Sequence, residues 1–305
     1  MAKVFEGVYP VVLTFYKDDL SIDEEGVRTL VRFLLDNRVN GLWVTGSISE
    51  SVLLSLEEQN RLAKIVLDEV NGKVPVIVTS INPSTKWIVE RCKLVKDLGA
   101  DAVAALAPNY WFKVVSKPDV LYEHFKTIAE AVDIPFFVYN FPDGNGVNVP
   151  PSTIARLSSE FSNVVGIKDT TTDLMHTIEV LKLTGYRMTV FSGSEDMMLP
   201  TLTVGGKGTV SGLANAFPEA VAELYRAFKE KDCEKAMKLN RKVIAFREIK
   251  SIGATPISFL KEALKIRGLP VKSHVRKPLL PLTEDERDEL KRKLIEIFGE
   301  EYEIG

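Results

Sequence analysis

Three residues of this chain have side chains suited to carbonyl chemistry. Lys168 ends the apolar run 164–167, and desolvation disfavours the charged form of a partly buried lysine, which leaves a neutral amine able to attack a carbonyl. Tyr139 ends another apolar run, and its phenol could pass a proton in the same cavity. Ser47 and the backbone amides around it could hold a carboxylate. Together these groups could bind and activate a small keto acid.

Each of these residues also fits an ordinary structural role when it is taken alone. A lysine that ends a strand usually reaches solvent, a tyrosine at the rim of a sheet can bind water through its hydroxyl, and a Gly-Ser pair such as Gly46-Ser47 is frequent in turns. The case for chemistry therefore depends on whether the fold brings these side chains together.

The elements that must position them alternate regularly along the chain. Short runs rich in β-branched residues are separated by segments with apolar residues at three- and four-residue spacing, which predicts parallel strands with crossover helices. Strands are expected at residues 8–14, 41–44, 74–79, 100–106, 135–139, 164–168, 188–192 and 208–211. Helices are expected at residues 23–37, 56–70, 84–98, 118–132, 172–183 and 218–229. Eight such units predict a (β/α)8 TIM barrel, whose active site lies at the carboxyl ends of the strands.

A doubly wound open sheet is the alternative, but no G-x-G-x-x-G follows the first expected strand. After residue 231 the alternation stops, and residues 234–250, 256–267 and 284–298 read as three helices. We therefore expect a catalytic barrel over 1–231 and a C-terminal helical region over 232–305.

Composition excludes several classes of function. Lys plus Arg number 39 against 42 Asp plus Glu, for a net charge of -3, so a clustered basic surface for nucleic acid is not expected. No run approaches the roughly 20 apolar residues of a membrane span, and no signal peptide is evident. Cys92 and Cys233 are far apart and suit a reducing, cytoplasmic setting. The three histidines, His124, His176 and His274, are scattered, so we expect no metal site and assign them no catalytic role.

Several motifs, taken in order, resemble those of one enzyme family. Tyr139-Asn140-Phe141-Pro142 matches Y-N-x-P, Gly166-Ile167-Lys168-Asp169 matches G-[IV]-K-[DE], and residues 46–51 lie where that family has a G-[TS]-T-G-E-like loop. The family is that of the pyruvate-dependent class I aldolases, which includes dihydrodipicolinate synthase, N-acetylneuraminate lyase and 2-keto-3-deoxygluconate aldolase. The resemblance runs from about Gly7 to the end of the chain.

The resemblance implies a role for each of six site residues. Lys168 would form an imine with pyruvate or another 2-keto acid, and Tyr139 would pass protons while a carbon-carbon bond to an aldehyde is made or broken. Ser47 and the amide of Ile48 would hold the carboxylate, and the backbone at Val210 would line the pocket. Tyr110 matches a tyrosine that reaches into a neighbouring subunit in some members. The family is commonly tetrameric, so a homotetramer is implied, and no cofactor is needed.

Departures from the family pattern bear on the substrate. Ile48 replaces a second hydroxyl residue and Ser49 replaces a glycine, so only the backbone part of the carboxylate pocket carries over. Dihydrodipicolinate synthases carry an arginine two residues beyond the proline of Y-N-x-P, where this chain has Gly144. A missing guanidinium removes on the order of 2 to 5 kcal/mol of carboxylate recognition.

We therefore expect a 2-keto-3-deoxy sugar acid aldolase. Dihydrodipicolinate synthase, a sugar-acid dehydratase and a non-catalytic keto-acid-binding barrel remain alternatives. The glycine-rich segment 205–208 could cradle a phosphate, but it precedes the last strand, so a tight turn is the better interpretation.

Overall fold

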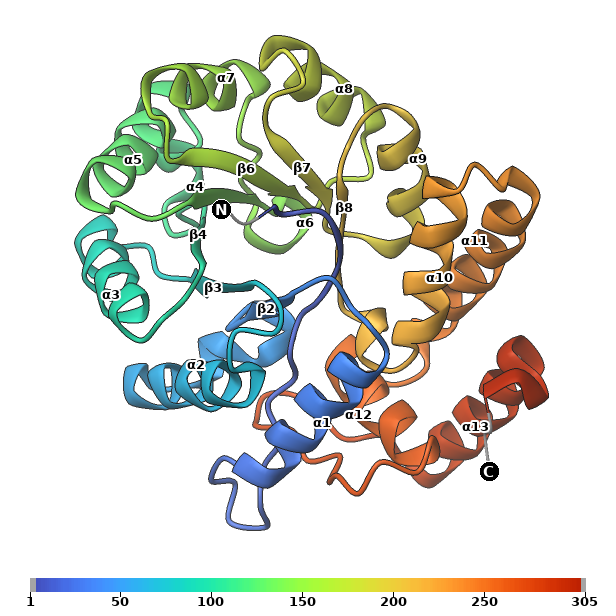
Figure 1. Cartoon of the computed structure of the whole chain (residues 1–305). Coiled ribbons are helices and arrows are strands. Elements are labelled where there is room, and N and C mark those ends of the chain that lie inside the picture. The colour runs from blue at the N-terminus through green and yellow to red at the C-terminus, as the bar shows by residue number, and fades with distance from the viewer. Residues whose placement is uncertain (1–3, 303–305) are drawn as a thin grey trace. The chain divides into compact units, whose positions relative to one another are not determined.

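The computed structural model describes residues 4–302, except for the side chains of residues 300 and 301. Eight strands alternate with helices in a (β/α)8 barrel fold that continues into C-terminal helices, as predicted (Figure 1). The strand order is β1-β8-β7-β6-β5-β4-β3-β2, and the pairings from β3 to β8 are all parallel. The strands are β1 (Gly7–Pro10), β2 (Leu42–Val44), β3 (Val76–Ser80), β4 (Ala102–Leu106), β5 (Phe136–Asn140), β6 (Val164–Asp169), β7 (Thr189–Ser192) and β8 (Gly208–Ser211).

The chain forms two compact units, of which the first comprises residues 4–7 and 74–210. It holds β3 to β7, and Figure 1 shows helices α3, α5, α7 and α8 along the outside of these strands. Its helices are α3 (Thr85–Asp97), α4 (Phe112–Val115), α5 (Pro118–Ala131), α6 (Pro142–Asn145), α7 (Pro151–Glu160), α8 (Leu174–Leu183) and α9 (Met198–Thr203). Aromatic rings fill the inside of this unit, where Phe137 stacks on Phe191 at 6.0 Å and meets Phe5 edge-on at 5.3 Å.

The second unit comprises residues 8–73 and 211–302. Its helices are α1 (Glu24–Asp36), α2 (Leu56–Val70), α10 (Pro218–Lys229), α11 (Cys233–Glu248), α12 (Pro256–Ile266) and α13 (Glu284–Phe298). Phe298 of α13 stacks on Phe217 with 3.7 Å between ring centroids and meets Phe246 of α11 edge-on. The C-terminal helices are thus bound into this unit by large buried rings, each of which buries on the order of 150–250 Å².

The first strand is shorter than the apolar run that predicted it. The run 8–14 was expected to be a strand throughout, but β1 ends at Pro10, and only Val11 bridges to Trp43 beyond it. Residues 11–16 are nevertheless buried. Apolar character here reflects burial rather than strand geometry, which is why the expected range was wrong at its carboxyl end.

The three helices expected after residue 232 are present as α11, α12 and α13, and they belong to the same compact unit as α1 and α2. The division into a 1–231 barrel and a 232–305 region stays a prediction. Within residues 4–302, no helix is both long enough and apolar enough to cross a bilayer.

Candidate active site

Lys168 and Tyr139 lie side by side on neighbouring strands. The register of β5 and β6 pairs Tyr139 with Lys168, and Lys168 Nζ lies 4.1 Å from the centroid of the Tyr139 ring. Only 4% of Lys168 and 1% of Tyr139 is exposed. The amine lies over the face of the phenol ring, and both side chains are almost wholly buried. The fold therefore brings together the two residues that the sequence singles out for imine chemistry.

The segment that follows β5 packs against Tyr139. The ring of Phe141 stacks on that of Tyr139, with centroids 5.9 Å apart and planes 5° apart. A Cβ added at Gly144 in α6 would lie only 2.2 Å from Phe141 Cε1, far inside van der Waals contact. No side chain fits at position 144 unless Phe141 moves. The position where the resembling synthases carry an arginine therefore holds a glycine beside a ring that would have to move to admit a side chain.

Asn145 anchors the end of α6. Its side-chain Nδ2 donates to the carbonyl of Ala107 at 2.9 Å, and its Oδ1 accepts from the amide of Val147 at 3.0 Å. Ala107 directly follows β4, so the α6 segment is fixed to the carboxyl end of the neighbouring strand. The short α6 segment that follows Phe141 is therefore anchored at its carboxyl end.

A buried polar network lies directly behind the lysine and the tyrosine. Asp169, next to Lys168, accepts from Asn140 Nδ2 at 2.9 Å through Oδ1 and from Thr177 Oγ1 at 3.2 Å through Oδ2. Its Oδ2 also lies 2.8 Å from His176 Nδ1. These four side chains are all less than 9% exposed. Asn140 is itself the residue after Tyr139, so the network joins the ends of β5 and β6.

His176 is the site feature that sequence reasoning missed. We expected it to be a helix residue without a role, and it does lie on α8, but its ring is buried against Asp169. Burial acts to lower the pKa of His176, whereas the hydrogen bond and charge of Asp169, the carbonyl of Val149 and the charge of Asp173 raise it, and the net direction is upward. The available signal was an aspartate at a strand end followed seven residues later by a histidine, a spacing that carries no periodic meaning by itself.

Tyr110 lies in a different setting from Lys168 and Tyr139. Tyr110, Trp111 and Phe112 are 64%, 73% and 52% exposed, and the Tyr110 ring packs edge-on against Trp111 with centroids 5.0 Å apart. Three consecutive exposed aromatic residues are unusual on the surface of a lone subunit. A role for Tyr110 in proton transfer would need a second subunit to meet this patch, as the family resemblance implies.

Ser47 and Ile48 belong to the other compact unit. They lie in the 3-10 turn Ser47–Ser49 that follows β2, and Ser49 Oγ donates to the carbonyl of Val12 at 2.6 Å. Thr14 Oγ1 donates in turn to the Ser49 carbonyl at 2.6 Å. The serine that replaces the family's glycine thus ties the turn to the segment after β1. The left-handed backbone, with φ 57°, falls on Glu50 instead.

Val210, the sixth predicted residue, is 1% exposed on β8 and lies in the same unit as Lys168. The glycine-rich segment before this strand is a turn, as we preferred. Its amides at Gly205 and Gly206 donate to the carbonyls of Leu202 and Thr201, and a Cβ on Gly208 would lie 1.9 Å from the Gly7 carbonyl oxygen. The amides at Gly205 and Gly206 are therefore not available to a phosphate.

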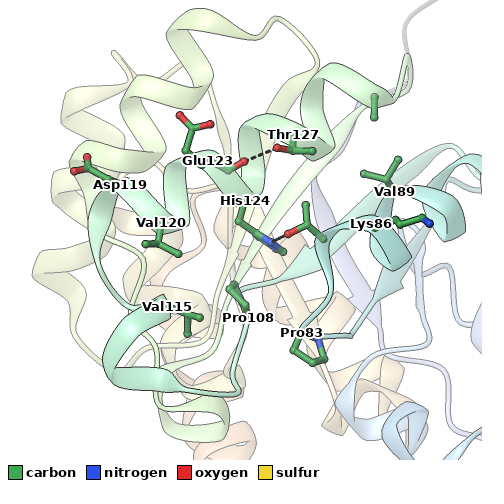
Figure 2. A pocket seen from close by; sticks show the side chains of 12 residues that line it. Pro83, Lys86, Val89, Pro108, Val115, Asp119, Val120, Glu123, His124 and Thr127 are labelled. Atoms are coloured by element: carbon green, nitrogen blue, oxygen red, sulfur yellow. Dashed lines mark hydrogen bonds between the residues drawn. The ribbon is translucent and has the colours of Figure 1, made fainter.

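A cavity of about 760 Å³ lies in the first unit beside α3 and α5, and none of the six predicted site residues lines it (Figure 2). His124 points into this region, where its Nδ1 lies 2.7 Å from Thr85 Oγ1, while its buried Nε2 has no hydrogen-bond partner among the described residues. Among the described residues, no three His, Cys, Asp or Glu side chains gather as ligands for a metal ion. The expectation that no metal is needed stays a prediction.

Known proteins are similar to this chain in sequence and in fold. A profile of the Dihydrodipicolinate synthetase family matches residues 4–297. The chain is 38% identical over 292 residues to a 4-hydroxy-tetrahydrodipicolinate synthase of Methanopyrus kandleri, covering 95% of each chain. It is 32% identical to a probable 2-dehydro-3-deoxy-D-pentonate aldolase of Escherichia coli, covering 94% of this chain and 96% of that one. The crystal structure of YagE from Escherichia coli K12 in complex with pyruvate has a TM-score of 0.92 at 29% identity, covering 96% of this chain and 99% of that one.

Proposed function

Because the chain belongs to the dihydrodipicolinate synthetase family, whose members are pyruvate-dependent lyases, we propose that it cleaves and forms 2-keto-3-deoxy sugar acids through a Schiff base on Lys168. The products of cleavage are pyruvate and an aldehyde. The observation that carries this proposal is the contact of Lys168 Nζ with the Tyr139 ring at 4.1 Å, within a pair that is almost wholly buried.

The proposed reaction uses these two side chains in turn. The neutral amine of Lys168 attacks C2 of the keto acid, and the C2 oxygen leaves as water with protons delivered through Tyr139. The protonated imine then accepts the electrons of the C3–C4 bond while the C4 hydroxyl gives its proton to Tyr139 and the aldehyde departs. Protonation of the resulting enamine at C3 and hydrolysis of the imine release pyruvate and restore the amine.

The glycine at position 144 supports a neutral aldehyde partner. A carboxylate-bearing aldehyde taken from water needs a charged donor to offset its lost hydration. The synthases of the family supply an arginine two residues after the proline, whereas here the Phe141 ring occupies the space that any side chain at 144 would need. The name of the Escherichia coli relative, a probable 2-dehydro-3-deoxy-D-pentonate aldolase, agrees with this choice.

A synthase that condenses pyruvate with aspartate semialdehyde is the second candidate. It is favoured by the higher identity, 38%, to the relative from Methanopyrus kandleri that carries the synthase name. In that case another cationic group has to bind the carboxylate of aspartate semialdehyde in place of the missing arginine. The two candidates share the Lys168 imine and differ only in the aldehyde.

The remaining assignments follow from the family resemblance. Ser47 and the amide of Ile48 hold the pyruvyl carboxylate, and the backbone at Val210 lines the pocket. Tyr110 joins the proton relay of a neighbouring subunit, and its exposed aromatic patch supports a homotetramer. The proposed setting is cytoplasmic carbohydrate metabolism.

Borohydride trapping tests the chemistry. The protein is incubated with pyruvate and sodium borohydride, its intact mass is measured, and the modified peptide is mapped. A reduced pyruvyl adduct on Lys168 is the expected result. A protein that binds pyruvate without gaining mass would instead be a reversible keto-acid-binding barrel.

Substrate assays then separate the two candidates. We expect pyruvate release from 2-keto-3-deoxy pentonates or hexonates, with little consumption of aspartate semialdehyde in the presence of pyruvate. The reverse pattern would make the chain a synthase despite Gly144. Release of water from the sugar acid without carbon-carbon cleavage would make it a dehydratase.

A further inference from the structure

The imidazole of His176 has a hydrogen-bond acceptor at each ring nitrogen. Nδ1 lies 2.8 Å from Asp169 Oδ2, and Nε2 lies 2.9 Å from the backbone carbonyl of Val149. A carbonyl oxygen can only accept, and an ionised carboxylate can only accept. A neutral imidazole carries a hydrogen on only one of its two nitrogens. Its other nitrogen would then face an acceptor with no hydrogen between them, at one of these two buried contacts.

We propose that His176 is a positioning residue: an imidazolium at neutral pH that donates to both acceptors and thereby fixes Asp169, and through it Lys168 and Tyr139. His176 touches neither of the two reacting side chains in any described contact, so its effect passes through its neighbours. The part of this inference that concerns turnover rests on the proposed function.

The neighbours form a closed ring of hydrogen bonds. His176 donates to Asp169, Asp169 accepts from Asn140 Nδ2 at 2.9 Å, and Asn140 Oδ1 accepts from the amide of Val149 at 2.9 Å. The carbonyl of Val149 accepts from His176 Nε2 and so completes the ring. Asn140 Nδ2 also reaches Asn148 Oδ1 at 2.8 Å. Each donor and acceptor of the ring is used, which is the condition under which a buried polar network rigidifies its surroundings.

The ring holds the two strand ends that carry the chemistry. Asn140 and Asp169 are register partners, as are Tyr139 and Lys168 one residue before them. Strand side chains alternate between faces, so Asn140 and Asp169 point away from the face that Tyr139 and Lys168 share. A proton on His176 therefore controls how firmly the ends of β5 and β6 are held together behind the reacting pair.

The charges around His176 favour the protonated state. Asp169 of β6 contacts the ring directly, and Asp173, the N-cap of α8, adds a second negative charge nearby. From the segment before α7 the ring meets only the carbonyl of Val149, which does not titrate. On α7 itself, Arg156 and Glu160 pair with each other at an exposed surface. No cation is among the groups that shift the pKa of His176.

Nuclear magnetic resonance of the whole chain with ¹⁵N-labelled histidine tests the protonation state directly. The chain has three histidines, and the His176→Gln spectrum assigns the signal. At pH 7.5, above the ordinary histidine pKa of about 6.5, we expect His176 to show two protonated ring nitrogens. A signal from one protonated and one bare nitrogen would overturn the inference. This measurement does not depend on any enzymatic activity.

Trapping kinetics test the positioning role. We expect His176→Gln to slow pyruvyl adduct formation on Lys168 by about 10- to 100-fold, the loss typical of a slightly misplaced reacting group. In the wild-type protein the trapping rate should fall as the pH rises through the pKa of His176, because the proton is then lost. His176→Arg keeps a positive charge at all these pH values and should remove that fall.

His124→Gln is the matched control. His124 is a buried histidine of the same unit, 5% exposed, and it contacts neither β5 nor β6 through its ring nitrogens. Its substitution should leave the trapping rate and its pH profile unchanged. Equal rates and equal pH profiles in wild type and His176→Gln would refute the positioning role. If the wild type itself forms no adduct, the proposed function fails, and the resonance measurement still decides the protonation of His176.

Discussion

His124 and His176 are buried to the same extent, 5% and 6% exposed, yet the structure shifts their proton affinities in opposite directions. His124 meets a threonine hydroxyl, and burial lowers its pKa to about 4. His176 meets an aspartate, and its pKa is raised despite burial. Burial alone therefore does not determine the charge of an interior histidine. The nearest partner decides it, because a carboxylate offsets the desolvation that a hydroxyl cannot.

The two regions also differ in what surrounds them. The His124 region is bordered by a cavity beside α3 and α5 (Figure 2), whereas the His176 region adjoins the strand ends that carry Lys168 and Tyr139. Substitutions in the His176 region should therefore affect chemistry, and matched substitutions in the His124 region should affect at most stability.

The largest difference between the two regions should appear when a lysine of each is replaced by alanine. Lys168→Ala should abolish both the borohydride adduct and turnover, because no other amine occupies its position. Lys86→Ala, at the cavity beside His124, should leave both unchanged. Intact mass spectrometry and a pyruvate-release assay measure the two effects. Near-normal turnover in Lys168→Ala would end the Schiff-base proposal and with it the functional contrast between the regions.

A smaller difference in kcat should appear when Tyr139 and Tyr122 are each replaced by phenylalanine. Tyr139→Phe should lower kcat by about 10²- to 10⁴-fold, the usual contribution of a positioned acid or base, and should still permit slow adduct formation. Tyr122→Phe, which removes a hydroxyl from α5, the helix that also carries His124, should change kcat less than about twofold, since Tyr122 donates to Glu160 and not to the site. Similar losses of kcat in both variants would assign the effect to packing instead.

Removing the hydrogen-bond partner of each histidine should destabilise the two regions unequally. Asp169→Ala leaves a buried imidazolium without its counter-charge and should lower the free energy of unfolding by about 3–5 kcal/mol. Thr85→Ala removes only a neutral hydrogen bond and should lower it by about 1 kcal/mol. Urea titrations at pH 7 measure both quantities. Equal losses would contradict the stronger hold that we expect at Asp169.

The pH dependence of stability should run in opposite senses for the two histidines. In the unfolded chain His124 takes up a proton below about pH 6.5, whereas in the folded chain it takes one up only near pH 4. The stability that depends on neutral His124 is therefore lost as the pH falls through that window. In the unfolded chain His176 releases its proton above about pH 6.5, whereas in the folded chain it keeps the proton up to a higher pH because its pKa is raised. The stability that depends on protonated His176 is therefore lost as the pH rises through that window. Each slope is at most about 1.4 kcal/mol per pH unit.

Urea titrations from pH 4 to pH 9 in the two glutamine variants separate these slopes. His124→Gln should flatten the acid side of the stability profile, and His176→Gln should flatten the neutral side. A flattening on the same side in both variants would contradict the opposite pKa directions.

The sequence predicted the framework well where local signals are strong. The expected ranges of α2, α10 and α13 match the structure to the residue. Ser55 and Thr283 form capping boxes at the starts of α2 and α13, and Pro218 occupies the first turn of α10. Such caps define helix starts through hydrogen bonds between neighbours in sequence, so a single sequence contains them.

The contacts of the site were predictable only in part. The motifs placed Lys168 and Tyr139 at adjacent strand ends, and the register confirms this. The partnership of His176 with Asp169 crosses a strand end, a turn and the start of α8, so no periodicity reveals it. Likewise, the sequence indicated that an arginine is missing at Gly144, but only the structure shows that the Phe141 ring lies where a Cβ at 144 would be.

The stack of Phe141 on Tyr139 also couples the effects of substitutions at positions 141 and 144. A Cβ at position 144 would lie 2.2 Å from the Phe141 ring, so the ring has to move before any side chain is accommodated there. Movement of that ring would in turn disturb its stack on Tyr139. The effects of substitutions at the two positions are therefore expected to be non-additive, with an arginine at 144 better tolerated beside a smaller residue at 141.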